Sequence, residues 1–259
     1  MAPRKCTFNS VARKIRAELK AGGCLKRSKS VQRFFKEEIQ SYGWRTADLR
    51  RATIRWRREI LKQFDLEFLV QVADKLFTGE INEEKSAAVF LLENVTAKLG
   101  DDEFSLLESW LARISNWSDH DALVHYLIAP MVAAKPVRVK SVFRWAKSLD
   151  RWHRRAACVA LIQGTRQRLF FHEMTQLSDQ LLSDQDDMVQ KGLGWLLRET
   201  AKVNPARTVP YLMRIRTRAP RLVLRTACET LTPAMKKRIL ASPCTALDRI
   251  RSKPRSCLE

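Results

Sequence analysis

Long apolar stretches are missing from this chain of 259 residues. Nowhere do about 18 apolar residues follow one another, which is the shortest run expected of a membrane-spanning helix. The opening sequence MAPRKCTFNS also lacks the apolar core of a secretory signal. We therefore expect a soluble, intracellular protein that has no membrane partner.

Metal-binding and redox motifs are missing as well. The six cysteines show no paired short spacing of the zinc or redox type, and several fall in apolar runs that predict reduced packing residues. The four histidines form neither an H-x-x-x-H nor an H-E-x-x-H pattern, so we expect solvated or partly buried side chains. The sequence predicts no metal and no cofactor.

Acidic residues are scarce beside basic ones. The chain has 48 Lys and Arg against 28 Asp and Glu, which gives a formal net charge of +20. Such an excess is expected of a protein that binds nucleic acid, although a merely solubilising surface would give the same total. Because the basic residues recur inside the helical patterns as well as in the tails, we favour a binding face.

Alternating strand patterns are absent, and helical periodicity runs through almost the whole chain. Apolar residues recur at i, i+3, i+4 and i+7. Gly, Pro, Asn and Ser residues interrupt this pattern after segments of roughly 12 to 18 residues, the length expected of packed helices. The sequence therefore predicts an all-α protein.

Charged residues recur at a fixed period within this pattern, with spacings of 35, 36, 34, 36 and 34 residues. The positions are Arg50, Lys85, Asp121, Arg155, Lys191 and Arg225. Such a period is typical of stacked helix pairs, so we expect a right-handed-type α-solenoid of about six antiparallel pairs with a concave basic groove. Residues 1–244 would form its single domain, and residues 245–259 a short, basic, mobile tail.

Asp121 is the acidic exception in this row. Trp117 lies one helical turn earlier, and Trp195 lies one turn beyond Lys191, so two indoles could flank the carboxylate as a site for a cation. Neighbouring cations would keep the pKa of Asp121 low and the carboxylate ionised. The alternative is a capping box, in which Asp121 bonds back to the amide of Ser118 and only ends its own helix.

Four stretches of the chain resemble one known family in order and spacing. They are VQKGLGWLLRETAKVNP (residues 189–205), NWSDHDALVHYLI (116–128), RWHRRAACVAL (151–161) and SYGWRTADLRR (41–51). They look like the AlkC/AlkD-type alkylpurine DNA glycosylases, which are built from HEAT-like repeats, and most closely like the AlkD branch. The resemblance covers roughly residues 8 to 235.

The resemblance implies a monofunctional DNA repair glycosylase of the base excision pathway. It would remove cationic N3- and N7-alkylated purines such as 3-methyladenine and 7-methylguanine from duplex DNA, without conventional base flipping. The family's catalytic aspartate falls on Asp121, its sugar-contacting tryptophans on Trp117 and Trp195, and its groove arginine on Arg155. We expect a monomer in the bacterial cytoplasm or nucleoid, with double-stranded DNA as its partner.

Further residues are expected to contact DNA. Thr46, Arg50 and Arg198 fall on family positions that touch the DNA backbone, and Phe34 stands where the AlkD branch can present a tyrosine. The basic row adds Lys85, Lys191 and Arg225, and we expect Lys191 and Arg155 to grip phosphates that flank the lesion.

The chemistry of the substrate agrees with these residues. An alkylated purine already carries positive charge, so it leaves as a neutral base without a general acid. The difficulty lies in the oxocarbenium-like sugar, which an ionised Asp121 can stabilise while it orients water. The alternative function is a non-catalytic HEAT-like module that binds DNA or RNA through the basic groove. A protein-interaction scaffold is a third possibility.

Overall fold

A computed structural model describes residues 7–241 of the chain. These residues form helices joined by short turns, with no named strand among them and one isolated bridge between Gln40 and Ile81. The N-terminal half contains α1 (Phe8–Ala21), α2 (Leu25–Val31), α3 (Thr46–Leu61), α4 (Leu66–Phe77), α5 (Asn82–Glu93), α6 (Asp101–Trp110) and α7 (Trp117–Leu123). The C-terminal half contains α8 (Ala129–Ala134), α9 (Val139–Trp145), α10 (Arg151–Ala160), α11 (Ile162–Arg166), α12 (Phe171–Leu181), α13 (Asp187–Val203), α14 (Pro205–Ile215), α15 (Arg221–Ala227) and α16 (Pro233–Leu240).

Short 3₁₀ and π segments complete the chain. The 3₁₀ turns are Gln32–Phe34, Thr96–Lys98, Leu111–Arg113 and Pro136–Arg138. Residues Val124–Ile128 form a π-helix that continues α7 into α8. Pro130 follows within α8, and a proline has no N–H to donate to the preceding turn, so the regular α-helical ladder is broken here.

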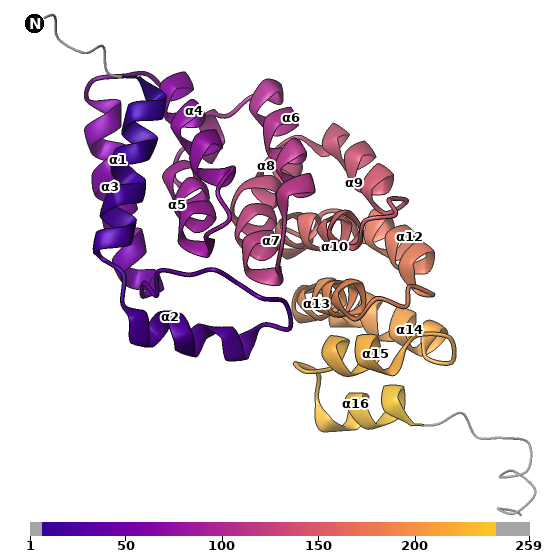
Figure 1. The fold of residues 1–259 in the computed structure, drawn as a ribbon. Coiled ribbons are helices and arrows are strands. Elements are labelled where there is room, and N and C mark those ends of the chain that lie inside the picture. Colours follow the sequence, from indigo (N-terminus) through magenta and orange to yellow (C-terminus); the bar gives the residue numbers. More distant parts are fainter. Residues whose placement is uncertain (1–6, 242–259) are drawn as a thin grey trace, which may run out of the picture.

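The helices stack as a curved solenoid (Figure 1). One row of helices, in which each contacts the next, consists of α3, α5, α7, α10, α13 and α15. The helices of the second row pack against this one, for example α4 on α5, α9 on α10 and α14 on α13. The prediction of an all-α solenoid is therefore confirmed.

All six positions of the periodic row lie on the first row of helices, one on each. Arg50 is on α3, Lys85 on α5, Asp121 on α7, Arg155 on α10, and the last two positions on α13 and α15. The period of the sequence thus identified the successive helices of one face. It did not determine which of these side chains reach the surface.

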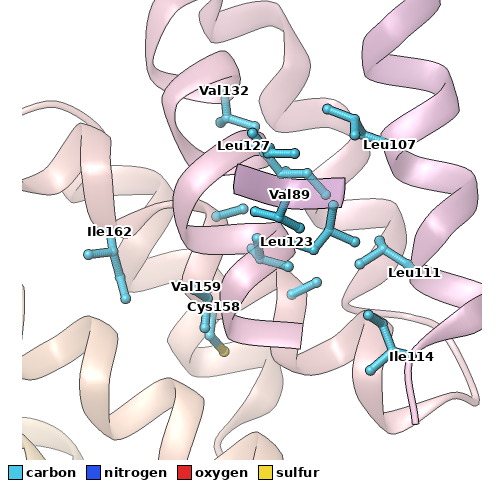
Figure 2. Packing of buried hydrophobic residues seen from close by; sticks show 14 of the residues in the cluster. Val89, Leu107, Leu111, Ile114, Leu123, Leu127, Val132, Cys158, Val159 and Ile162 are labelled. Atoms are coloured by element: carbon cyan, nitrogen blue, oxygen red, sulfur yellow. The ribbon is translucent and has the colours of Figure 1, made fainter. Parts of the chain in front are cut away.

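Apolar side chains from both rows form one continuous core. Figure 2 shows part of this core, to which α5 contributes Val89, α6 Leu107, α7 Leu123 and α10 Val159. Small residues let neighbouring helices approach. At Gly194 of α13, an added Cβ would lie 2.6 Å from the Cβ of Thr226 in the adjacent helix, so a larger residue there would force the two helices apart.

The described helices are short for a membrane. Among residues 7–241 no single helix is long and apolar enough to cross one, and only residues 117–134 and 136–145 taken together, bent by 119° at their junction, reach that length and composition. The predicted tail, residues 245–259, lies outside the described residues.

Candidate active site

Helix α7 begins without any help from Asp121. Its N-cap is Asn116, whose side-chain oxygen accepts hydrogen bonds from the amides of Ser118, at 2.9 Å, and Asp119, at 3.1 Å. The capping box of Ser118 and Asp121 that we considered from the sequence is therefore not formed. Asn116 satisfies the free amides of the first turn, which leaves the Asp121 carboxylate available for other contacts.

The Asp121 carboxylate is held by two side chains. Arg155 donates from Nε to Oδ1 at 3.1 Å and from Nη2 to Oδ2 at 2.9 Å, a two-pronged ion pair between α10 and α7. Nδ1 of His120 lies 2.8 Å from Oδ1. The Asp121 side chain is 23% exposed, whereas that of Arg155 is 7% exposed. The carboxylate thus reaches the surface while its partners lie behind it.

These contacts determine the charge of the carboxylate. Burial by itself would raise the pKa of Asp121, but the hydrogen bond from His120 and the positive charge of Arg155 outweigh it. The pKa of Asp121 therefore lies below its usual value, and the group is ionised at neutral pH. This direction agrees with the sequence-based expectation.

The two predicted tryptophans line the same cavity as Asp121. This cavity has a volume of about 390 Å³, and its wall includes Trp117, Trp195, His125 and Thr46. The imidazole of His125 packs against the indole of Trp195 with ring centres 5.5 Å apart. Four of the predicted site residues, which come from three separate parts of the chain, therefore line one cavity.

Trp117 is fixed in place by the chain that leads from α2 to α3. We call residues 32–45 the crossing segment, since Figure 1 shows it running from α2 towards α13 and back to α3. Its Phe35 stacks on Trp117 at 5.0 Å, and the carbonyl of Phe34 accepts a hydrogen bond from the indole N–H at 3.3 Å. Lys36 pairs with Asp187 of α13 at 2.8 Å.

The crossing segment also places Phe34 near the catalytic candidates. The Phe34 ring is 60% exposed, with the guanidinium of Arg33 4.8 Å from its centre. It lines a second hollow together with Lys36, Trp117, Arg155 and Lys191. An exposed aromatic ring beside cationic side chains suits contact with a nucleic acid.

Lys85, which was predicted to contact DNA, does not belong to the exposed basic row. Its side chain is 5% exposed and its ammonium pairs with Asp119 at 2.9 Å. The same ammonium donates to the carbonyl of Arg113 at 2.7 Å and to the hydroxyl of Ser115 at 3.1 Å. These three partners use its three N–H groups, so Lys85 ties α5 to the start of α7.

Arg155 also differs from the prediction that it grips a phosphate. Its guanidinium is directed at Asp121, and Nη1 donates a 2.6 Å hydrogen bond to the carbonyl of Met188. The stem packs under Gly192 of α13, where an added Cβ would lie 3.2 Å from Cγ. The hydrogen bonds of Arg155 therefore position the carboxylate of Asp121.

Two other predicted DNA contacts are partly exposed and paired with carboxylates. Arg50 is 33% exposed, pairs with Glu93, and has its guanidinium 4.0 Å from the ring centre of Phe90 in the cavity wall. Lys191 is 42% exposed and lies 3.2 Å from Asp187. Because surface ion pairs of this kind contribute little, such a cation can exchange its carboxylate for a phosphate.

The last predicted contacts are Arg198, Arg225 and Thr46, of which Thr46 lines the cavity. Arg198 is 27% exposed and pairs with Glu199 at 3.3 Å and Glu229 at 2.5 Å. Arg225 on α15 and Thr46, the first residue of α3, are exposed. Of the predicted row, Arg50, Lys191 and Arg225 are thus at least partly exposed, whereas Lys85 is buried and Arg155 pairs with the partly exposed Asp121.

Two histidines of the site were missed by sequence reasoning. His120 is fully buried instead of solvated or partly buried, and nothing in the sequence marked it, since adjacent residues on a helix point in different directions. His125 is four residues beyond Asp121 and could have been found from the helical period. Burial lowers the pKa of His125, so its imidazole is neutral at physiological pH.

Metal chemistry was not expected from the sequence. Within the part of the chain that the structure describes, no group of three or more His, Cys, Asp or Glu side chains is arranged to hold a metal ion.

The fold and the site define an α-solenoid protein with an ionised carboxylate on the row of helices that also carries a set of cations. The family is shown by the sequence: the chain belongs to the DNA alkylation repair enzyme family, whose model matches residues 15–231. Its role is thus the enzymatic repair of alkylated DNA, and DNA is its partner.

Solved structures support the fold. A predicted DNA alkylation repair enzyme from Enterococcus faecalis has a TM-score of 0.73 and 15% identity, over 82% of this chain and 97% of its own. A protein from Streptococcus mutans UA159 has a TM-score of 0.53 and 17% identity, over 71% of this chain and 100% of its own. The comparison with curated proteins finds no match.

Proposed function

We propose that this protein is a monofunctional DNA glycosylase that hydrolyses the N-glycosidic bond of cationic N3- and N7-alkylated purines in duplex DNA. The observation that carries the proposal is the ionised Asp121 carboxylate, which lines a cavity between Trp117 and Trp195. Membership of a family of DNA alkylation repair enzymes supports the substrate class.

The charge of the substrate explains why the site needs a carboxylate and no general acid. When the bond from C1′ to the alkylated nitrogen breaks, its electron pair neutralises the base, which leaves without a proton. Positive charge then develops on the sugar, where an ionised Asp121 stabilises it. Water attacks C1′ on the face opposite the departing base, and its proton passes to solvent.

The aromatic walls suit the same transition state. Indole faces attract positive charge, and Trp117 and Trp195 both face the cavity that contains the carboxylate. Because Trp117 is stacked on Phe35 and hydrogen-bonded to the carbonyl of Phe34, its ring needs little reorganisation when substrate arrives. We infer that the two indoles hold the lesion's sugar against Asp121.

The exposed cations would bind the DNA backbone independently of base sequence. Arg50 is on α3, Lys191 and Arg198 are on α13, and Arg225 is on α15, all in the row of helices that carries Asp121. Each can bind a DNA phosphate and displace a counterion from it, so affinity for DNA should fall as the salt concentration rises. Thr46 and Phe34 would add contacts to the DNA backbone at the same face.

We also propose that the lesion is excised without conventional base flipping. The Asp121 side chain is 23% exposed, and its partners Arg155 and His120 fill the space behind it. A substrate sugar can therefore meet the carboxylate from the surface. This arrangement would leave the modified base outside a deep pocket, in contrast to glycosylases that extrude it.

Base release separates the proposed enzyme from a module that only binds. Duplex DNA treated with a methylating agent is incubated with wild-type protein and with the Asp121→Asn variant, and free 7-methylguanine and 3-methyladenine are measured. We expect release by the wild type and loss of release by the variant, with duplex binding kept by both. Intact, salt-sensitive binding by a wild type that releases no base would support the non-catalytic module.

A further inference from the structure

A buried imidazole touches the reactive carboxylate, and the mechanism above gives it no task. His120 of α7 is 0% exposed. Its Nδ1 lies 2.8 Å from Oδ1 of Asp121, and its Nε2 lies 3.2 Å from the carbonyl oxygen of Trp152 on α10. The Trp152 ring is tilted against it with ring centres 5.6 Å apart. The imidazole is thus fixed between two helices.

The position of the ring hydrogen follows from these neighbours. A carboxylate oxygen and a carbonyl oxygen are both acceptors, so neither can donate to the imidazole. The neutral ring with hydrogen on Nδ1 donates to Asp121, and so does the imidazolium. Only the neutral form with hydrogen on Nε2 would direct a lone pair at the carboxylate. The neutral form with hydrogen on Nδ1 leaves the Nε2 lone pair facing the carbonyl oxygen of Trp152, which costs less than a lone pair facing a charged carboxylate, and the imidazolium satisfies both acceptors. In both of these forms Nδ1 carries a hydrogen.

The donors are divided unevenly between the two carboxylate oxygens. Oδ1 of Asp121 accepts from His120 Nδ1 and from Arg155 Nε, whereas Oδ2 accepts from Arg155 Nη2. An ionised carboxylate oxygen can accept about two hydrogen bonds. Oδ1 is thereby filled, and Oδ2 keeps room for one further partner.

We propose that His120 is a positioning residue that turns Oδ2 of Asp121 towards the substrate by donating a hydrogen bond to Oδ1. The inference rests on the proposed glycosylase function and identifies Oδ2 as the oxygen that stabilises the sugar in that reaction. Oδ2 faces the developing positive charge on the sugar and accepts from the attacking water. Without His120, each oxygen of the carboxylate accepts one hydrogen bond from Arg155, and the hydrogen bonds no longer distinguish Oδ2 from Oδ1.

Two substitutions separate the hydrogen bond from packing. His120→Leu fills similar space without a donor. His120→Asn keeps an N–H on the atom bonded to Cγ, where Nδ1 stands, so it can still donate to Oδ1. Losing a hydrogen bond to a charged group slows a reaction that depends on it by roughly 10- to 100-fold. We expect that loss for His120→Leu and a rate close to wild type for His120→Asn.

The matched control is another histidine with an aspartate partner. Nδ1 of His153 lies 2.6 Å from Oδ2 of Asp150, at the start of α10 and outside the lining of the cavity. His153→Leu should excise at the wild-type rate. The measurement is the single-turnover release of 7-methylguanine at saturating protein, together with duplex affinity and the melting temperature of every variant.

The outcomes distinguish the inference from the function on which it rests. If wild type releases no base, the proposed function fails and the inference falls with it. If wild type is active while His120→Leu matches it, only the inference is overturned. Equal slowing of His120→Leu and His120→Asn would also overturn it, because packing alone would then explain the effect.

A second measurement applies if His120→Leu does not fold. In wild-type protein labelled with ¹⁵N, the chemical shifts and couplings of the imidazole report which ring nitrogen carries hydrogen. We expect hydrogen on Nδ1 of His120. A neutral ring with hydrogen on Nε2 would contradict the bond to Asp121.

Discussion

Replacing Arg155 tests whether this residue holds Asp121 or grips DNA. Arg155→Met keeps a long apolar stem and removes the guanidinium. Asp121 then loses two of its three donors, and the carbonyl of Met188 loses the bond from Nη1. The remaining donor is His120, which has one N–H to offer to a single oxygen of Asp121.

The size of the effect follows from burial. Breaking a buried ion pair from one side costs roughly 3–5 kcal/mol. Because the Asp121 side chain is 23% exposed and water can reach it, we expect the lower end of this range. For a domain of this size, about 3 kcal/mol corresponds to a fall in melting temperature of roughly 6–12 °C.

The same change should alter the pH dependence of base release. The charge of Arg155 is one cause of the low pKa of Asp121, so its removal raises that pKa. Asp121 acts when ionised, and the acid limb of the rate profile should therefore move to higher pH. Calorimetry and single-turnover release measured across pH report the two effects separately.

Lys191→Ala is the control, since Lys191 is 42% exposed on the neighbouring helix. It should leave the melting temperature nearly unchanged and lower duplex affinity, with a salt slope smaller by about 0.9. If Arg155→Met showed this same pattern, with an unchanged melting temperature and pH profile, Arg155 would be a phosphate contact and our account of it would be wrong.

Three further predictions concern other parts of the site. Lys85→Met leaves the buried Asp119 without its cation, so it should lower the free energy of unfolding, measured by chemical denaturation, by roughly 3–5 kcal/mol. It should not change the dependence of DNA affinity on salt concentration. A changed dependence would mean that Lys85 contacts DNA. Phe35→Ala removes the ring stacked on Trp117 and should slow single-turnover base release by roughly 2- to 10-fold, with unchanged affinity for the duplex. Release at the wild-type rate would mean that Trp117 keeps its position without the Phe35 ring. Because the pKa of Asp121 is lowered on folding, the stability from its ionised form is complete above the unfolded value of about 3.9 and is lost as pH falls through the folded value. Base release should likewise stay level from about pH 8 to about pH 5, and a decline centred near neutral pH would show that another group controls the reaction.

The period of the sequence predicted the stacked helices correctly but not the direction of every side chain. Its six positions fall on six successive helices of one row. However, Lys85 pairs with Asp119 and Asp121 pairs with Arg155, each across 34 residues. Opposite charges one repeat apart thus form ion pairs between adjacent helices, which removes them from an exposed basic row.

Contacts outside the periodic helices could not be predicted in this way. The crossing segment has no regular pattern, yet its Phe35 supports Trp117 and its Lys36 reaches α13. His120 follows the same principle, because its role depends on Trp152 of α10 being packed beside α7. Such contacts join residues that are distant in sequence and depend on how the whole solenoid curves.

The most direct test of the account is the rate at which Asp121→Asn excises 7-methylguanine from one defined duplex. The exchange removes the negative charge and changes the shape of the side chain little. We expect single-turnover release to fall by about 100-fold or more, as for the loss of one electrostatic group in an enzyme site, while the dissociation constant for the duplex stays near that of wild type. Release at the wild-type rate would contradict the central claim, because a neutral amide cannot stabilise the developing positive charge.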